Sequence, residues 1–286
     1  MDEIFVSQGA RQLCLAKSPP QVSSLLMLHG VTRRWQSFLP LWSSLATRWE
    51  LAALDFRGHG KSDRVDGGYQ VYDYVEDVIS VLDQQYERPV MLYGHSLGAM
   101  VAAATAAQVG DRVSAVVLED PPFHTMGKRI SQSVLLGFFQ ALRELAGDAR
   151  GVGTLAALLA DTDLHDPRTG LKIRLGDTRD AAALRFTASC LKKLDPAVLT
   201  TIVAGEWLNG YDIESVFRKI TCPVLLLQAD PVAGGMLTDE DADDVDGWLA
   251  DSARVKFQGS GHLIHWDQTS KLLNCVLGFL ESVQMR

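Results

Sequence analysis

Short apolar runs alternate with stretches of helical periodicity along most of the chain, and this alternation constrains the fold more than any other feature. The clearest runs are residues 24–28, 51–55, 89–93, 114–119, 223–228 and 254–257. Their nearly unbroken apolar character is typical of strands that are covered on both faces. The helical spacing between the runs predicts helices that cover the sheet. The expected fold class is therefore α/β, with a mostly parallel sheet flanked by helices.

Two shorter runs, 4–7 and 12–16, are expected to form edge or antiparallel strands, which brings the sheet to eight strands. No convincing strand follows between Glu119 and Pro223. This interval instead carries helical spacing, and Asp195-Pro196 is a favourable helix start, because Asp can cap free N–H groups and Pro is tolerated at the first helical position. We therefore expect a helical cap at 121–221, inserted after the sixth strand of an α/β core formed by 1–120 and 222–286.

Charge and cysteine content narrow the classes of partner. The 286 residues are enough for one large domain or two modest ones. With 27 Lys and Arg against 35 Asp and Glu, the net charge is −8, so a general attraction to nucleic acid or anionic membranes is not expected. The four cysteines are scattered without CxxC spacing, and neither a secretory signal nor a membrane-spanning run is apparent. These features predict a cytoplasmic protein that acts on a small molecule.

The acidic stretch 238–246 allows two interpretations. Aspartates at 239, 241 and 243 mimic the opening of a calcium-binding EF-hand loop, but the sixth position is Asp244 instead of Gly and the twelfth is Ala250 instead of Glu. Thr238 and Asp241 have the spacing of a helix capping box, with negative charge at the positive end of the helix dipole. We therefore predict a capped helix start here, and no metal site.

The strongest chemical signal lies at 90–98, where a predicted strand runs into Gly94-His95-Ser96-Leu97-Gly98 and then into an alanine-rich helix. A turn this sharp strains the backbone at the serine and needs small neighbours, and it projects the hydroxyl above the sheet at a helix N-terminus. Ser96 is therefore the candidate nucleophile. The alternative is a serine that merely caps the helix.

A serine hydroxyl needs a base to remove its proton, and that base must be oriented by a third group. His262 follows the last predicted strand in Gly259-Ser260-Gly261-His262, at the same carboxyl edge of the sheet as Ser96. His265 is the rival candidate. We favour His262 as the base, because the preceding glycines allow a sharp turn, and expect His265 to be a hydrogen-bonded support.

Together these motifs resemble the α/β-hydrolase fold family. The resemblance covers His29-Gly30, the Asp-Phe-Arg-Gly-His-Gly-Lys-Ser segment at 55–62, the Ser96 motif and the Gly-x-Gly-His motif, and it spans 25–98 and 223–280. It implies a serine-nucleophile hydrolase that needs no cofactor. It also implies that the backbone N–H groups of Val31 and Leu97 bind the oxyanion, while His29 braces its loop.

The resemblance leaves two candidates for the acid of the triad. In most of the family the acid follows the strand before the last, which here gives Asp230. In a minority branch, which includes haloalkane dehalogenases and some cofactor-free ring-product hydrolases, it lies about two dozen residues beyond the nucleophile. Asp120 is 24 residues after Ser96. We favour Asp120, because the loop at Asp230 lacks the longer acidic turn that is usual there, and we expect Glu119 to be structural.

Arg33 and Arg34 lie beside the predicted oxyanion loop. Either could clamp a substrate carboxylate, but we favour a surface position or a salt bridge to the cap. Four aromatic residues could line an apolar pocket or belong to the core: Trp35, Phe123, Trp207 and Trp266.

The leading functional prediction is a hydrolase of a small or medium carboxylic ester, lactone or amide that works through an acyl-enzyme. A carbon–carbon bond hydrolase or perhydrolase with the same triad is the first alternative. A ligand-binding receptor or pseudoenzyme on the same fold is the second. Epoxide hydrolysis and dehalogenation are disfavoured, because in this family they use a carboxylate nucleophile and position 96 is Ser. The sequence carries no signal for oligomeric state.

Overall fold

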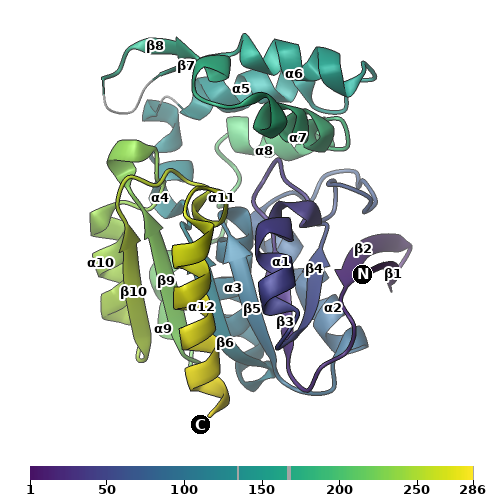
Figure 1. Cartoon of the computed structure of the whole chain (residues 1–286), viewed down its shortest axis with the longest axis vertical. Coiled ribbons are helices and arrows are strands. Elements are labelled where there is room, and N and C mark those ends of the chain that lie inside the picture. Colours follow the sequence, from purple (N-terminus) through teal and green to yellow (C-terminus); the bar gives the residue numbers. More distant parts are fainter. Residues whose placement is uncertain (134, 166–168, 286) are drawn as a thin grey trace.

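The computed structural model describes residues 1–133, 135–165 and 169–285. An eight-stranded sheet in the order β1-β2-β4-β3-β5-β6-β9-β10 forms its centre (Figure 1). The strands are β1 (Asp2–Gln8), β2 (Arg11–Lys17), β3 (Ser24–Leu28), β4 (Glu50–Leu54), β5 (Val90–His95), β6 (Val113–Glu119), β9 (Val224–Ala229) and β10 (Ser252–Phe257). β1 and β2 pair antiparallel with each other, β2 pairs antiparallel with β4, and the remaining pairs are parallel. The predicted sheet is confirmed, including its two antiparallel strands.

Helices cover both faces of the sheet, which explains why the central strands are apolar throughout. One face carries α1 (Leu39–Leu45), α11 (Ile264–Asp267) and α12 (Thr269–Gln284). The other carries α2 (Val71–Gln85), α3 (Leu97–Val109), α9 (Ile213–Arg218) and α10 (Asp239–Trp248). The first ten residues of α3 are all buried, because this helix lies between the sheet and the helices α2 and α9. Short 3-10 turns occur at Trp35–Phe38, Gly110–Arg112, Ile130–Gln132, Leu175–Asp177 and Pro231–Ala233.

The chain between β6 and β9 forms most of the upper part of the molecule in Figure 1. It contains α4 (Phe123–Met126), α5 (Leu135–Leu145), α6 (Val152–Ala160), α7 (Ala181–Leu191) and α8 (Pro196–Val203), as well as β7 (Asp163–His165) and β8 (Lys172–Arg174). The expectation of a purely helical segment is wrong at the β7–β8 pair. Each of these strands has only three residues, with both ends exposed, so neither produces an apolar run. The division into a core and a cap at 121–221 stays a prediction.

Two local predictions about helix starts are confirmed. The Asp195 side chain accepts a hydrogen bond from the N–H of Ala197 at the start of α8, with Pro196 in the first turn. The Thr238 hydroxyl likewise accepts from the N–H of Asp241 at 3.1 Å, so the acidic stretch begins α10. A short side chain that satisfies a free N–H group explains both boundaries.

A buried ion pair fixes the loop after β4 to α2. The Arg57 guanidinium donates two hydrogen bonds of 2.6 Å to the carboxylate of Asp77, and both side chains are almost completely buried. Such a bidentate pair has a strict geometry, so it sets the position of the loop that leaves the carboxyl end of β4.

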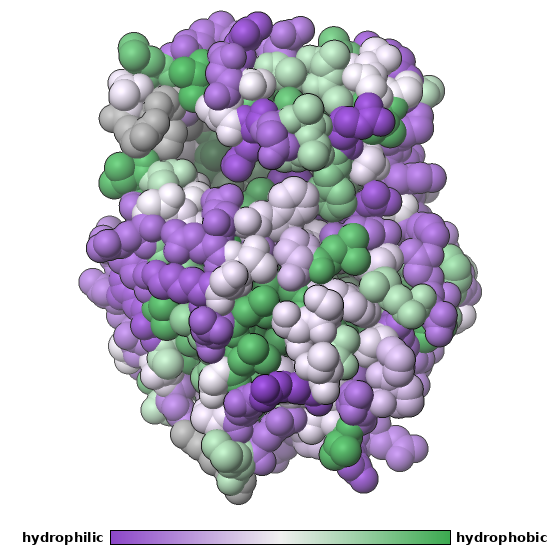
Figure 2. Space-filling model, in the orientation of Figure 1, coloured by the Kyte–Doolittle hydropathy of each residue, from purple (hydrophilic) through white to green (hydrophobic). Residues whose placement is uncertain are grey.

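Figure 2 shows polar and apolar residues interspersed over one face of the molecule, which is hollowed beneath the segment between β6 and β9. Among the described residues, no helix combines the length and the apolar character that a membrane span requires.

Candidate active site

The backbone at Ser96 has the strained conformation that the sequence predicts. Its φ and ψ are 54° and −115°, between the end of β5 and the start of α3. A Cβ at Gly94 would lie 2.2 Å from the carbonyl oxygen of Gly98, and one at Gly98 would lie 1.9 Å from that of Leu28. Both glycines are therefore required by close backbone contacts, and they hold the serine at the carboxyl edge of the sheet.

Strained backbone is concentrated at this edge. Besides Ser96, the non-glycine residues with positive φ in the described chain are Thr32, Asp120 and Phe123. Thr32 lies in the loop after β3, and the other two follow β6. A β-branched residue such as Thr rarely adopts φ of 65°, and such outliers persist where the surrounding structure holds a functional loop in place.

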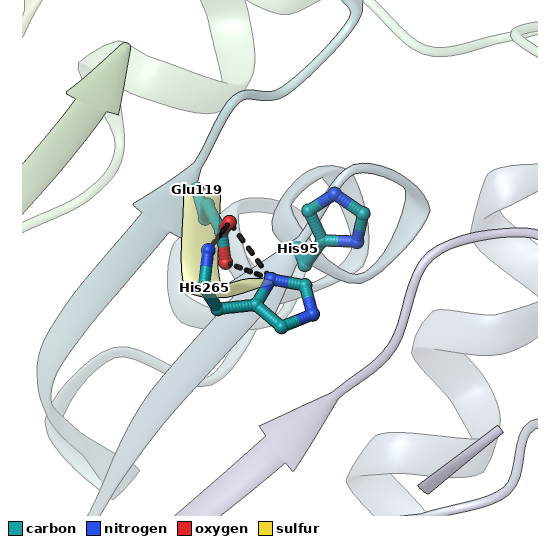
Figure 3. Close-up of side chains that lie close together, drawn as sticks. All are labelled: His95, Glu119 and His265. Atoms are coloured by element: carbon teal, nitrogen blue, oxygen red, sulfur yellow. Dashed lines mark hydrogen bonds and ion pairs between the residues drawn. The ribbon is translucent and has the colours of Figure 1, made fainter. Parts of the chain in front are cut away.

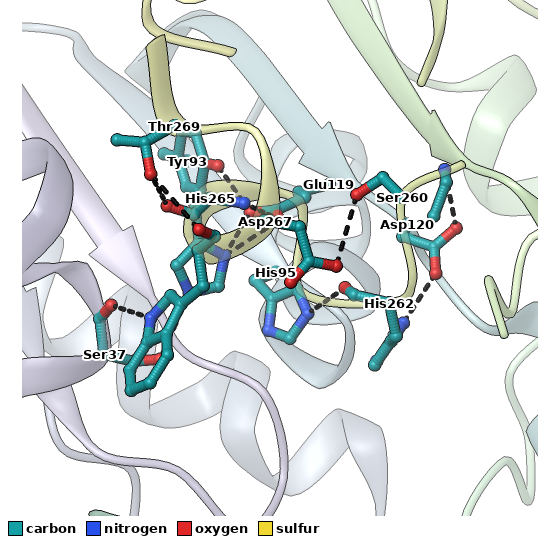
Figure 4. A network of polar contacts seen from close by, with 12 residues as sticks. Ser37, Tyr93, His95, Glu119, Asp120, Ser260, His262, His265, Asp267 and Thr269 are labelled. Atoms are coloured by element: carbon teal, nitrogen blue, oxygen red, sulfur yellow. Dashed lines mark hydrogen bonds and ion pairs between the residues drawn. The ribbon is translucent and has the colours of Figure 1, made fainter. Parts of the chain in front are cut away.

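Asp120 and His262 form a hydrogen-bonded pair next to Ser96. His262 Nδ1 donates to Asp120 Oδ2 at 2.6 Å (Figure 4). The Asp120 side chain is completely buried, and it also accepts from the N–H groups of Ala229, Met236 and Leu237 at 3.1, 2.8 and 3.2 Å. These hydrogen bonds stabilise a buried carboxylate and aim it at the imidazole. Within the described chain, Ser96 and His262 are not hydrogen-bonded to each other, although both line one pocket.

Asp230, the alternative acid, has a different role in the structure. Its carboxylate accepts from the N–H groups of Val232 and Gly259 at 2.9 Å each. These two backbone hydrogen bonds lower the pKa of Asp230. The side chain thus caps the turn after β9, while the imidazole of His262 is hydrogen-bonded to Asp120. The contacts favour Asp120 as the partner of the histidine.

A second carboxylate–imidazole pair lies beside the first. His265 donates to Glu119 from its backbone N–H at 2.9 Å and from Nδ1 at 2.8 Å (Figure 3). The Tyr93 hydroxyl donates to the same carboxylate. Ser37 donates to His265 Nε2 at 3.2 Å. Both members of the pair are completely buried. Glu119 and His265 therefore satisfy each other, as the sequence analysis expects of a structural acid and a supporting histidine.

His95 connects the two pairs. Its Nε2 donates to the carbonyl oxygen of His262 at 2.9 Å, and its ring centre lies 4.7 Å from that of His262 and 5.0 Å from that of His265. Burial, followed by the neighbouring imidazoles, lowers the pKa of His95. His95, Glu119 and His265 each offer an atom that could ligate a metal, all within 4.8 Å of one another. Glu119, both ring nitrogens of His265 and Nε2 of His95 are hydrogen-bonded within the protein, whereas Nδ1 of His95 is buried without a partner among the described residues. We assign the three residues to the support of the His262 loop.

The predicted oxyanion donors are the backbone N–H groups of Val31, in the loop after β3, and of Leu97, the first residue of α3. In the described chain, neither the N–H of Val31 nor that of Leu97 donates to a protein acceptor. His29 braces this loop as expected: its Nδ1 donates to the carbonyl of Gly30 at 2.8 Å, and its Nε2 accepts from the N–H of Phe56 at 3.2 Å. Free N–H groups on a rigid loop can bind negative charge without reorganisation.

A pocket of about 550 Å³ opens above Ser96 and His262. Of the predicted substrate-binding residues, Arg33, Trp207 and Trp266 line it. Trp207 is almost completely buried, and Trp266 donates from Nε1 to the carbonyl of Ser37 at 2.8 Å.

The other three predicted substrate-binding residues do not line this pocket. Trp35 donates to Glu3 and packs 5.8 Å from Trp42, so it belongs to the core. Phe123 is completely buried against the Phe217 ring. Arg34 donates to Ser189 at 3.1 Å outside the pocket. Arg33, Arg34 and Trp35 are consecutive in the chain, yet of these three only Arg33 lines the pocket, so proximity in the sequence does not predict which side chain reaches it.

Several lining residues were missed by the sequence analysis. Arg179 and Asp267 are the charged ones, and the apolar wall is formed mainly by Leu135, Phe138, Phe139, Leu142, Leu164, Ile173, Leu175 and Leu184. The apolar periodicity of α5 and α7 was visible in the sequence. It does not reveal which part of each apolar face packs on the protein and which part lines a cavity.

The model of the alpha/beta hydrolase family matches residues 25–273. The chain belongs to the α/β hydrolase family. It is 38% identical over 208 residues to 2-(acetamidomethylene)succinate hydrolase of Mesorhizobium japonicum, covering 72% of this chain and 70% of the relative. It is 34% identical over 129 residues to epoxide hydrolase B of Mycobacterium tuberculosis, covering 43% of this chain and 36% of that protein.

Solved structures agree on the fold. The crystal structure of E-2-(acetamidomethylene)succinate hydrolase superposes with a TM-score of 0.74 at 22% identity, over 98% of this chain and 99% of the other. The crystal structure of the enol-lactonase from Burkholderia xenovorans LB400 superposes with a TM-score of 0.74 at 16% identity, over 97% of this chain and 100% of the other. At such identities the likeness establishes the shared fold alone.

Proposed function

We propose that the protein is a serine hydrolase that cleaves a small or medium carboxylic ester, lactone or amide through an acyl-enzyme. Ser96 is the nucleophile, His262 the base and Asp120 the orienting acid. The observation that carries the proposal is the Asp120–His262 hydrogen bond beside a strained serine in one pocket. Membership of a hydrolase family, with a hydrolase of small molecules among its relatives, supports the same reaction class.

The proposed reaction uses the contacts around this pocket. As Ser96 Oγ bonds to the substrate carbonyl carbon, its proton passes to His262 Nε2, while Asp120 holds the Nδ1 proton and stabilises the imidazolium. The N–H groups of Val31 and Leu97 bind the oxyanion. His262 then gives the proton to the leaving alcohol or amine. Water attacks the acyl-enzyme with His262 again as base, and the acid departs. The hydrogen bond between Ser96 and His262 forms when substrate fills the pocket.

We also propose that residues 121–221 act as a cap that selects the substrate. Helices α5 and α7 supply much of the apolar wall above Ser96, so changes in this segment alter what the pocket admits. Epoxide hydrolysis is not proposed, because the residue at the nucleophile position is Ser.

The test is labelling with a fluorophosphonate probe, followed by turnover of a panel of esters, lactones, amides and vinylogous ketones. The intact protein should be labelled at Ser96 and should turn over carboxylic derivatives, whereas Ser96→Ala should lose both properties. Ser282→Ala, at an exposed position of α12, is the matched control and should keep them. Labelling without turnover would favour a pseudoenzyme, and cleavage of vinylogous ketones alone would favour carbon–carbon hydrolysis. Unchanged turnover by Ser96→Ala would refute the serine mechanism.

A further inference from the structure

We propose that the substrate of this pocket carries a carboxylate close to the scissile carbonyl, and that Arg33 and Arg179 bind it. The inference rests on the proposed function and specifies its substrate class. Both arginines line the pocket that contains Ser96 and His262. Arg33 also lies in the loop that supplies the N–H of Val31, so an anion held by its guanidinium shares the pocket with the oxyanion position.

The charge of Arg33 has no acidic partner in the described chain. Its Nη1 donates to the hydroxyl of Thr187 at 2.9 Å, and its guanidinium carbon lies 5.9 Å from the centre of the Trp266 ring and 6.0 Å from that of Phe186. The side chain is only partly exposed. A hydroxyl and two aromatic rings position a guanidinium but do not neutralise it, so a partly buried positive charge remains available to a ligand.

Arg179 adds a second positive charge to the same pocket. It precedes α7, is exposed, and forms no ion pair with a described residue. Burial lowers the pKa of Arg33, and the charge of Arg179 lowers it further. Two like charges near one cavity are unfavourable in the free protein. An anion bound between them removes that repulsion, and guanidinium groups match the planar geometry of a carboxylate.

Arg34 provides a contrast within the same loop. It points away from the pocket toward Ser189, and its charge favours the ionised forms of Glu3 and Asp55, although burial raises the pKa of Asp55 overall. Nearby carboxylates therefore compensate Arg34, whereas no described carboxylate compensates Arg33. Arg34 is the matched control, because it is the same residue type at the adjacent position.

The other residues that line the pocket indicate which distribution of charged and apolar groups a substrate should have. Asp267 is the acidic residue among the described lining residues, and its Oδ2 accepts from the N–H of Gly261 at 3.0 Å and from the Ser260 hydroxyl at 3.4 Å (Figure 4). It is thus tied to the His262 loop. The wall contributed by α5 is apolar. A molecule with one anionic end and an apolar remainder fits this distribution.

The test compares monomethyl esters of the C4 to C7 dicarboxylic acids with matched esters in which a carboxamide replaces the free carboxylate. Acid release is followed with a pH-stat. The intact protein should prefer the anionic ester at one or more chain lengths. Arg33→Gln should reduce that preference in kcat/KM by roughly 10- to 100-fold, because charge-assisted hydrogen bonds are lost. Arg179→Gln should reduce it severalfold, and Arg34→Gln should preserve it.

Arg179 is exposed, so its variant provides a test even if Arg33→Gln fails to fold. Absence of a preference for the anionic ester at every length, or an equal loss of preference in Arg34→Gln, would overturn the proposal. Fluorophosphonate labelling of Ser96 separates the two levels of inference. A labelled protein without anion preference refutes the carboxylate site alone, whereas failure to label refutes the serine hydrolase itself.

Discussion

Replacing Asp120 with Asn tests the proposed triad most directly. In the intact protein, Oδ2 of Asp120 accepts hydrogen bonds from His262 Nδ1 and the N–H of Met236. Oδ1 accepts from the N–H groups of Ala229 and Leu237. With its oxygen at the Oδ1 position, an Asn side chain keeps the last two hydrogen bonds. Its NH₂ group then faces His262 Nδ1 and can only donate to it. The imidazole is forced to carry its proton on Nε2 and cannot accept the proton of Ser96.

The magnitude follows from this change of tautomer. In a serine protease triad the same replacement lowers kcat about 10⁴-fold, which corresponds to about 5 kcal/mol of transition-state stabilisation. The partly buried N–H of Met236 also loses its acceptor, which should destabilise the fold by about 0.5–1.5 kcal/mol. Asp230→Asn is the matched control. Asp230 is partly exposed, so water can replace its hydrogen bond to Gly259, and activity should change by less than about tenfold.

The assay is kcat on an activated ester under saturating conditions, with urea unfolding of both variants to confirm that they are folded at the assay temperature. A fluorophosphonate probe should label Asp120→Asn far more slowly than the intact protein. The reasoning fails if Asp230→Asn shows the large loss while Asp120→Asn stays within tenfold of the intact protein.

Three further predictions concern stability, each read from urea unfolding. Gly98→Ala should prevent stable folding, because its Cβ would lie 1.9 Å from a backbone oxygen. The control is Gly278→Ala in α12, where a Cβ meets no atom within 4 Å, and it should stabilise the fold by about 0.5–1 kcal/mol. Equal effects of the two substitutions would contradict this prediction. Asp77→Ala should lower the free energy of unfolding by about 3–5 kcal/mol, because it leaves the buried guanidinium of Arg57 without its carboxylate partner. A decrease below 1 kcal/mol would contradict this. Burial lowers the pKa of His59 to about 4, so the stability that depends on its neutral form is complete above pH 6.5 and is lost as the pH falls toward 4. Burial raises the pKa of Asp55 to about 6, so this group alone would make the fold more stable as the pH falls from 6 to 4. Because burial also lowers the pKa values of His29 and His95, the free energy of unfolding should fall on acidification, and an unchanged urea midpoint from pH 7 to 5 would refute this.

The sequence predicts most of the sheet because parallel strands covered on both faces must be apolar throughout. The capping residues Asp195 and Thr238 also mark helix starts correctly, because they satisfy their own backbone neighbours. The β7–β8 pair is missed, since three-residue strands with exposed ends carry no such pattern. Local rules succeed where the residues that enforce a structure are close together in the chain.

The sequence by itself determined the α/β core and the Ser96 turn, because glycine spacing and apolar runs act over a few residues. Only the tertiary structure decided which carboxylate meets His262, since Asp120 and Asp230 both follow strands at the same sheet edge. The same holds for Arg33 and Arg34. They are adjacent in the chain, yet one lines the pocket and the other does not, because side-chain direction depends on the residues packed around each of them.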